Sequence, residues 1–285
     1  MEIVVPNDGP RTGVVFRVSN EIIATGDWCD LYNGTYESDG TIRPAIFKRA
    51  RDGEGLDRLS HERKVLNTFW EAVKDQNWPF FGHTLPKHFG RAGDGDLEFH
   101  VLEKCEGYTV ETLKSYFPSG LPPVQVAWML TRFLTTLAAA HQLGWAHCSS
   151  LPQHLLVRWD NVKQHRFATV LDWASATKIG DKFPEINPRY SLFYPPEAWS
   201  GGEVTAASDL FMFGQVANYL LGGDLKNRKV PESVPRQLRG IIHSCLIPSA
   251  LRRSSDASDL LLNHLRPALA EIWGSPKYVD FQIPQ

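Results

Sequence analysis

The sequence lacks the features that usually place a protein outside the cell. Its four cysteines are scattered without the spacing of a metal site or a disulfide framework, so reduced thiols are expected. The first residues show no charged segment followed by a long apolar stretch, as a secretory signal would. These absences favour a cytoplasmic protein.

Long apolar runs and an excess of charge of one sign are also missing. The best candidate for a membrane span, 215–223, is far shorter than the roughly 20 residues that a bilayer requires. Because the formal net charge is only -2 at pH 7, a broad nucleic-acid-binding surface is not expected. The function must therefore be sought in particular residues.

The rest of the chain falls into two halves of different pattern. The first half contains short β-rich runs between turn residues, with one stretch at helical spacing over 56–73. After Pro122 the pattern becomes helical, most clearly over 126–143 and 207–221. An α+β fold is predicted, with a β-rich N-terminal lobe that has one helix and a mainly helical C-terminal lobe. The expected strands cover 13–18, 21–25, 31–37, 43–48 and 97–103.

Several short segments in a fixed order carry residues that can do chemistry. Gly26 lies in a turn between two expected strands, and a run of sequence Ala-Ile-Phe-Lys ends at Lys48. Glu62 lies on the helix that follows. A loop that begins at His147 comes later, followed by a segment of sequence Asp-Trp-Ala that starts at Asp172.

In this order the segments resemble the protein-kinase superfamily, over about 21–265, which is most of the chain. The resemblance implies a kinase-like domain with an N-lobe over about 21–103 and a C-lobe over about 108–265. An N-terminal extension over 1–20 and a C-terminal tail over 266–285 complete the expected organisation.

The resemblance also implies an ATP site that uses Mg²⁺ or Mn²⁺. Asp172 is the expected metal ligand, with His154 as a second candidate; the alternative is that Asp172 forms an ion pair with Lys48 in place of a cation. Of the three family glycines that cover the phosphates only Gly26 remains, and acidic residues stand beside it, so nucleotide binding is expected to be weak or absent. The residues that would contact the cofactor are Gly26, Lys48, Glu62, Glu103, Cys105 and Asp172.

The catalytic loop departs from the family pattern at three places. The family has an aspartate that accepts a proton, a lysine that neutralises the transferred phosphate and an asparagine that holds metal; here those places are Ser149, Leu151 and His154. A serine accepts no proton at neutral pH without its own base, and losing a general base costs roughly a hundred- to ten-thousand-fold in rate. Leu151 brings no charge to the transition state, and Mg²⁺ prefers oxygen ligands to an imidazole such as His154.

By contrast, residues that build the C-terminal lobe of the family persist. The resemblance implies an ion pair between Glu197 and Arg253, and it implies that Asp209 holds the loop backbone near His147. The chain is therefore expected to be a pseudokinase, a binding or regulatory protein that transfers little or no phosphate and acts on a protein partner. Candidate surfaces for that partner are the helix that carries Glu62, the segment 172–197 and the tail.

A second hypothesis belongs to another class. The chain would then be an active but atypical protein kinase or nucleotidyl transferase that uses ATP. It would rely on Lys48, Glu62 and Asp172, with His147 or His154 as the base and with Mn²⁺ as the favoured metal.

Overall fold

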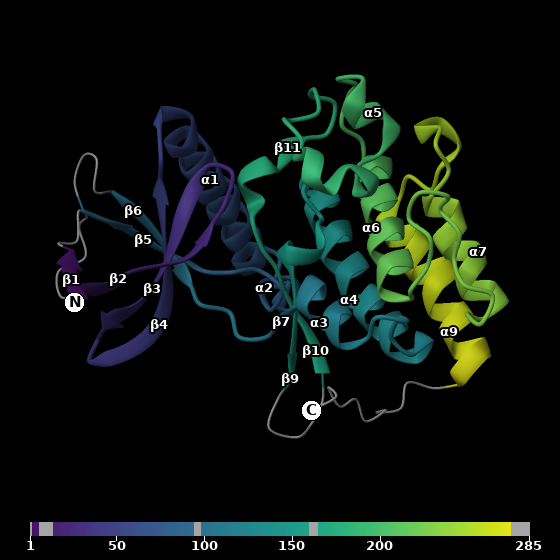
Figure 1. The fold of residues 1–285 in the computed structure, drawn as a ribbon, viewed down its shortest axis with the longest axis horizontal. Coiled ribbons are helices and arrows are strands. Elements are labelled where there is room, and N and C mark those ends of the chain that lie inside the picture. Colours follow the sequence, from purple (N-terminus) through teal and green to yellow (C-terminus); the bar gives the residue numbers. More distant parts are fainter. Residues whose placement is uncertain (1, 6–13, 94–97, 160–164, 275–285) are drawn as a thin grey trace. The chain divides into compact units, whose positions relative to one another are not determined.

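The architecture combines a sheet with a larger set of helices (Figure 1). A computed structural model describes residues 2–5, 14–93, 98–159 and 165–274. Within these ranges no helix is both long enough and apolar enough to cross a membrane.

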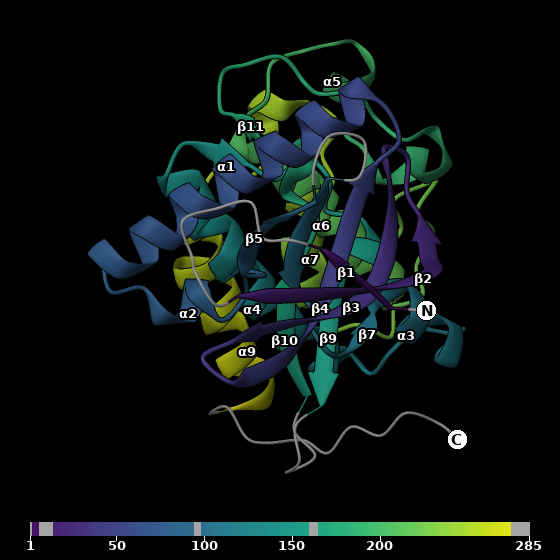
Figure 2. The same ribbon diagram turned by 90° about the vertical axis from the view of Figure 1, so that its left-hand side faces the viewer.

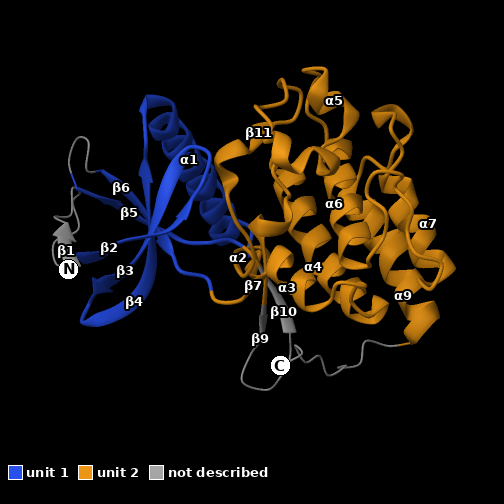
Figure 3. Ribbon diagram, in the orientation of Figure 1, with its two compact units in different colours: residues 1–77, 85–105 blue, residues 78–84, 106–285 orange. Residues whose placement is uncertain are grey.

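The chain divides into two compact units (Figure 3). Unit 1 contains residues 1–77 and 85–105, and unit 2 contains residues 78–84 and 106–285. Unit 1 is β-rich with one long helix, whereas unit 2 is mainly helical. The α+β class predicted from the sequence is therefore confirmed, as is its division into a β-rich part and a helical part.

Unit 1 is built on a six-stranded sheet whose strand order is β1-β2-β3-β4-β6-β5. Every neighbouring pair of strands is antiparallel. A tight turn with positive φ at Asp39 and Gly40 joins β3 to β4, a conformation that aspartate and glycine tolerate best. The strands are β1 (Glu2–Val5), β2 (Val15–Thr25), β3 (Cys29–Ser38), β4 (Thr41–Ala50), β5 (His88–Ala92) and β6 (Phe99–Glu103).

An apolar cluster covers one face of this sheet. Phe47 of β4 meets Phe16 of β2 and Phe99 of β6 edge to face, at ring-centroid distances of 6.1 and 5.9 Å. Such pairs stabilise a core by about 0.5–1.5 kcal/mol beyond the burial of their area. Successive side chains of a strand point to opposite faces, so Lys48 is turned away from this cluster.

The long helix α1 (Gly53–Asp75) packs against β4 and β5 (Figure 2). Asp52 caps its start, because a carboxylate oxygen accepts the N–H of Gly55 at 2.8 Å. The buried residues Leu59, Glu62, Val65, Leu66 and Phe69 recur every three or four positions. The helix predicted over 56–73 is confirmed, and it extends slightly beyond that range at both ends.

Three features of the sheet differ from the prediction. Strand β1, which lies in the range 1–20 expected as an N-terminal extension, was not predicted. The strands expected over 13–18 and 21–25 are one strand, β2, whose register against β3 shifts after Val18. Strand β5 was not predicted, because Gly90 in its centre is a poor strand former and adopts a φ of 143°.

The centre of unit 2 consists of the helices α4 (Pro123–Gln142) and α6 (Ala206–Leu220). Phe133 of α4 and Phe213 of α6 pack with their ring centroids 5.6 Å apart. Thr205 caps α6 in a reciprocal capping box with Ser208. Both helices agree with the ranges 126–143 and 207–221 predicted from their apolar periodicity.

Smaller elements surround these two helices. The strands β7 (Tyr108–Thr109), β9 (Leu155–Trp159) and β10 (His165–Val170) form one small sheet, and β8 (Trp145–Ala146) pairs with β11 (Thr177–Lys178). The other α-helices are α2 (Pro79–Gly82), α3 (Val110–Tyr116), α5 (Pro196–Trp199), α7 (Arg236–Cys245), α8 (Ala257–Asp259) and α9 (Arg266–Trp273). Shorter helical turns are η2 (Pro152–His154), η3 (Trp173–Ser175), η4 (Pro188–Phe193), η5 (Ala250–Arg252) and the π-helical η6 (Leu260–Leu265).

Two segments lie at the bounds of the expected domains. Residues 78–84 belong to unit 2, although they fall inside the range expected for the N-lobe. The carbonyl of Thr84 accepts the N–H of Val170, and its hydroxyl accepts from Thr136, both at 2.9 Å. The expected C-terminal tail begins as α9, and its part beyond residue 274 lies outside the described residues.

The close packing at Gly34 generates a prediction for stability. A Cβ atom there would overlap with the Arg17 carbonyl oxygen and the Phe47 ring, so Gly34→Ala should destabilise the protein by about 1–3 kcal/mol. A Cβ atom at Gly53, which lies in a helix, would meet nothing within 4 Å. Gly53→Ala is therefore the matched control and should leave stability unchanged or slightly raised. Urea unfolding of both variants measures the difference. Equal midpoints would contradict this packing.

Candidate functional site

Unit 1 contains a buried ion pair between Lys48 and Glu62. The ammonium nitrogen of Lys48 lies 2.9 Å from both carboxylate oxygens of Glu62. The Lys48 side chain is 11% exposed and that of Glu62 is 2% exposed. Glu62 lies on the buried face of α1, and Lys48 points from β4 toward that helix. The pairing predicted from the sequence is thus confirmed.

The backbone groups of the turn at Gly26 are engaged in hydrogen bonds within unit 1. Gly26 donates its N–H to the carbonyl of Cys29 at 2.9 Å, and the guanidinium of Arg51 donates to the carbonyls of Gly26 and Asp27. The neighbouring Trp28 lies under the guanidinium of Arg58, 4.3 Å from ring to cation. The Gly26 amide, which the resemblance would direct to a phosphate, is therefore already hydrogen-bonded.

Glu103 and Cys105, two of the residues expected to contact the cofactor, lie at and just after the end of β6. Glu103 donates its N–H to the carbonyl of Lys87 at 2.8 Å, as part of the contact between β5 and β6. The Cys105 thiol lies 3.8 Å from the Glu103 carbonyl. Unit 1 ends at Cys105.

Unit 1 contains two neighbouring buried histidines, which the sequence did not predict. The rings of His88 and His100 meet at a centroid distance of 5.6 Å. Within the described residues, Nε2 of His88 and both ring nitrogens of His100 lack a hydrogen-bond partner, although Oε1 of Glu98 lies 3.4 Å from Nε2 of His100. Burial is the main cause that lowers the pKa of His88 to about 3 and that of His100 to about 4, and nearby cations such as Arg63 add to it.

In unit 2, the carboxylate of Asp209 holds the start of the loop at 147–154. It accepts the N–H of His147 at 2.7 Å and that of Cys148 at 2.9 Å, and His141 contacts it at 2.9 Å. Burial alone would raise the pKa of Asp209, but the contacts with His141 and His147 lower it below its ordinary value. These bonds hold Cys148 at a φ of 58°, which is unfavourable for a residue with a side chain. The predicted role of Asp209 is confirmed.

His147 itself is fully buried and serves the packing of this loop. Its Nε2 lies 3.0 Å from the Leu171 carbonyl, which can only accept, so Nε2 carries the hydrogen. Nδ1 then accepts from the Ser150 hydroxyl at 3.0 Å, and the ring packs edge to face on Trp173. Burial lowers the pKa of His147 to about 4, so the ring is neutral at pH 7.

The rest of the loop brings Ser149, His154 and Asp172 together. Nδ1 of His154 lies 2.8 Å from the Ser149 carbonyl oxygen and 3.1 Å from the Ser149 hydroxyl. Nε2 of His154 lies 3.3 Å from a carboxylate oxygen of Asp172. Leu151 is 1% exposed and packs in the core. The sequence had marked each of these residues, but it did not predict the contact between His154 and Asp172.

The described residues contain no group of three or more His, Cys, Asp and Glu side chains arranged to hold a metal ion. The two candidate metal ligands, Asp172 and His154, are nevertheless neighbours. Asp172 adopts a left-handed conformation with a φ of 60° and a ψ of 66°, and the indole of the next residue, Trp173, donates to the Val170 carbonyl at 3.0 Å. Any cation here would therefore have two protein ligands and would need water or a bound molecule to complete its coordination.

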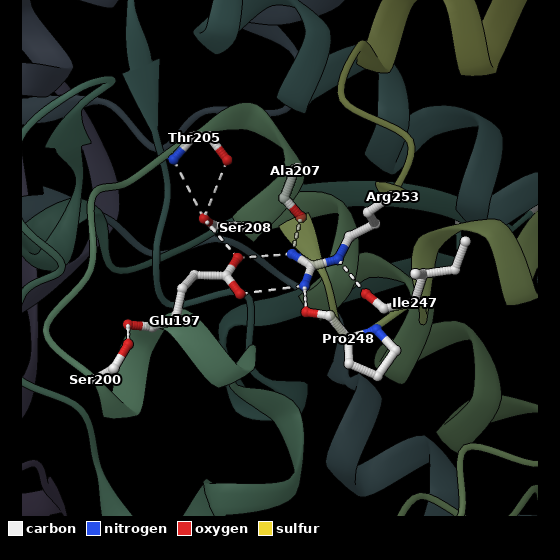
Figure 4. A network of polar contacts seen from close by, with 8 residues as sticks. All are labelled: Glu197, Ser200, Thr205, Ala207, Ser208, Ile247, Pro248 and Arg253. Carbon is white, nitrogen blue, oxygen red and sulfur yellow. Dashed lines mark hydrogen bonds and ion pairs between the residues drawn. The ribbon is translucent and has the colours of Figure 1, made fainter. Parts of the chain in front are cut away.

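Unit 2 contains the ion pair predicted between Glu197 and Arg253 (Figure 4). Two guanidinium nitrogens contact the two carboxylate oxygens, at 2.7 and 3.2 Å. Arg253 also donates to the carbonyls of Ala207, Ile247 and Pro248, as Figure 4 shows. The Arg253 side chain is 0% exposed, so these bonds satisfy a fully buried charge.

Comparison with known proteins finds similarity to serine/threonine-protein kinases. The chain is 25% identical over 240 residues, 81% of its length, to the serine/threonine-protein kinase PknH of Mycobacterium bovis and to PknH of Mycobacterium tuberculosis. It is 26% identical over 190 residues, 60% of its length, to serine/threonine-protein kinase F of Synechocystis. These matches, together with the fold, support a place in the protein-kinase-like superfamily.

The matched relatives are much longer proteins. The chain covers 33% of the Mycobacterium bovis kinase, 32% of the Mycobacterium tuberculosis kinase and 37% of the Synechocystis kinase, about a third of each. No protein-family model matches the chain.

The Glu197–Arg253 pair generates a prediction for stability. Glu197→Ala would leave the Arg253 charge buried without its partner, which should destabilise the protein by about 3–5 kcal/mol. Glu54→Ala removes an exposed ion pair with Arg58 on α1 and should cost less than about 1 kcal/mol. Thermal and urea unfolding measure both changes. A cost for Glu197→Ala no larger than that for Glu54→Ala would contradict the role of this pair.

The buried histidines predict a loss of stability in acid. The unfolded chain takes up protons on His88 and His100 below a pKa of about 6.5, whereas the folded pKa values are about 3 and about 4. Their contribution is thus fully present above pH 6.5 and is lost as the pH falls toward 4, at up to about 1.4 kcal/mol per pH unit and histidine. The double variant His88→Gln/His100→Gln should unfold with a shallower dependence on pH over this range. An unchanged slope in urea unfolding series would contradict the assignment.

Proposed function

We propose that this chain is a pseudokinase, a protein-kinase-like binding or regulatory protein that transfers little or no phosphate. One observation carries the proposal: within the described part of the chain, the ring nitrogen beside the hydroxyl of Ser149, at the place of the family's proton acceptor, is Nδ1 of His154, and that nitrogen faces a carbonyl oxygen. The loop backbone around it is held as the family requires, so the loss concerns the chemistry alone.

The protonation of His154 explains why Ser149 lacks a base. The Ser149 carbonyl can only accept, so a contact of 2.8 Å requires the hydrogen of His154 to be on Nδ1. A protonated nitrogen cannot take the proton of the Ser149 hydroxyl, even at 3.1 Å. A general base typically contributes a hundred- to ten-thousand-fold to the rate. Ser149 therefore cannot replace the missing carboxylate.

Leu151 adds a second, independent loss. It takes the place of the family lysine that neutralises the transferred phosphate, and it is an apolar side chain buried to 1% exposure. Stabilisation of the charge that develops in the transition state is usually the largest single contribution to catalysis.

We also propose that the chain binds a nucleotide weakly. The relatives are named serine/threonine-protein kinases, enzymes that in general use ATP with Mg²⁺ or Mn²⁺. The pair of Lys48 and Glu62 is retained, which favours contact with nucleotide phosphates. The amide of Gly26 is bonded to the Cys29 carbonyl, and this disfavours phosphate binding at that turn. We therefore expect weak binding of ATP, with Glu103, Cys105 and Asp172 as the other contacting positions.

The activity of such a protein would come from binding a protein partner. The proposed surfaces are the helix α1, which carries Glu62, and the segment from Asp172 to Glu197. Binding in the ATP site would displace these elements, and a partner bound to them would respond to that change. The second segment exposes Leu192 at 45% and, just beyond it, Trp199 at 52%. Apolar side chains of this size on a surface favour contact with another protein.

An atypical transferase that uses ATP is the second candidate. The observation that favours it is the retention of Lys48, Glu62 and Asp172, which are the groups that position nucleotide and metal in active relatives. His147 is an unsuitable base in this scheme, because both of its ring nitrogens are used within the buried loop. His154 would be the base, and it would have to act through Nε2.

The two functions differ in a transfer assay. Purified protein is incubated with radiolabelled ATP, Mg²⁺ or Mn²⁺, and both generic acceptors and a whole-proteome extract from which endogenous kinases have been inactivated. We expect labelling no higher than that of the variants Lys48→Ala and Asp172→Asn, because the base and the phosphate-neutralising cation are missing. Lys64→Ala changes an exposed lysine of α1 and is the matched control. Labelling that Lys48→Ala and Asp172→Asn abolish and Lys64→Ala preserves would overturn the pseudokinase proposal in favour of the transferase.

A further inference from the structure

The turn at Gly26 is fastened by one residue, Arg51, to the chain between β4 and α1. Nη2 of Arg51 donates to the carbonyls of Gly26 and Asp27, and the backbone N–H of Arg51 donates to the Trp28 carbonyl at 3.2 Å. Three consecutive carbonyls of the turn therefore accept hydrogen bonds from a single residue. Because hydrogen bonds from a guanidinium are stronger than those between neutral groups, Arg51 holds the turn more firmly than a neutral side chain would.

The start of α1 forms a second attachment to the same turn. The guanidinium of Arg58 lies 4.3 Å from the centroid of the Trp28 ring, and it also donates to Glu54 at 3.2 Å. The backbones approach each other closely as well, since a Cβ atom added to Gly55 would lie 2.4 Å from the Trp28 carbonyl oxygen. Trp28 is thus packed against the first two turns of α1.

These contacts oppose the rearrangement that phosphate binding at the turn requires. The Gly26 N–H donates to the Cys29 carbonyl at 2.9 Å, and it must leave that carbonyl before it can bind a phosphate oxygen. Such a change moves the carbonyls that Arg51 holds. The turn that can bind phosphate is therefore a minor state, and the apparent affinity falls in proportion to the population of that state.

We infer that Arg51 is an autoinhibitory latch, which fastens the Gly26 turn to α1 and thereby lowers the affinity of the chain for nucleotide phosphates. This latch rests on the weak ATP binding of the proposed function and is a second cause of that weakness, beside the loss of the other two family glycines. A partner that bound the start of α1 and displaced Arg51 would release the turn. The latch would then link the proposed partner surface to nucleotide binding.

Hydrogen–deuterium exchange of the full chain, without nucleotide, measures how firmly the turn is held. Arg51→Ala removes two side-chain hydrogen bonds and should speed exchange of the Gly26 amide roughly tenfold. Arg58→Ala removes the contact with the Trp28 ring and should speed this exchange roughly two- to fivefold. Arg43→Ala removes an exposed arginine near the other end of β4 and is the matched control, which should leave exchange unchanged.

Calorimetric titration with ATP and Mg²⁺ tests the effect on binding. Arg51→Ala should bind ATP roughly three- to tenfold more tightly than wild-type protein, because its two side-chain bonds no longer oppose the rearrangement of the turn. Loss of a positive charge by itself weakens the binding of an anion, so Arg43→Ala should bind ATP equally or slightly less tightly than wild type. The two substitutions remove the same charge, and a gain in affinity specific to Arg51→Ala identifies the latch.

Two results would overturn the latch. One is a Gly26 amide that exchanges equally fast in wild type and in Arg51→Ala, and the other is ATP binding by Arg51→Ala no tighter than that of wild type. Circular dichroism establishes that each variant is folded. Failure here is distinguishable from failure of the proposed function, because phosphate transfer by wild-type protein overturns the pseudokinase proposal whatever the exchange rates are. Loss of the latch without phosphate transfer leaves that proposal standing.

Discussion

The carboxylate of Asp209 fixes the loop on which the functional interpretation depends. Asp209 is fully buried in the first turn of α6. Its carboxylate accepts hydrogen bonds from the backbone N–H groups of His147 and Cys148, and Nε2 of His141 also contacts it. A buried charge is tolerated only when such hydrogen bonds compensate for the lost hydration. The same bonds hold Cys148 in an unfavourable backbone conformation and thereby set the direction of the chain into Ser149.

The anchored loop then determines which chemistry is possible. Its backbone gives the Ser149 carbonyl to Nδ1 of His154, which makes that nitrogen a donor and removes it as a base for the Ser149 hydroxyl. The opposite nitrogen is turned toward Asp172. One hydrogen bond thus makes Nδ1 a donor toward the Ser149 carbonyl and turns Nε2 toward the carboxylate of Asp172.

Much of the fold was predictable from the sequence. The periodic spacing of apolar residues indicates the helices, and the order of the motifs indicates which charged residues form pairs. The apolar spacing of α1, α4 and α6 indicated these helices, and the motif order indicated the pairs Lys48–Glu62 and Glu197–Arg253. The contact between His154 and Asp172 was not predicted, because it depends on how one ring is turned by a carbonyl of its own loop. The hydrogen bonds from Arg51 to the Gly26 turn were missed for a similar reason, since a long exposed side chain has many partners within reach.

The proposed loss of a base at Ser149 requires the hydrogen of His154 to be on Nδ1 and not on Nε2. Nitrogen-15 NMR of the imidazole groups measures this directly, with His154 assigned by the loss of its signals in His154→Asn. At neutral pH, without added metal, we expect Nδ1 of His154 to be protonated and bonded to the Ser149 carbonyl. An unprotonated Nδ1, with the hydrogen on Nε2 alone, would give Ser149 a base and would contradict the proposed loss of phosphate transfer.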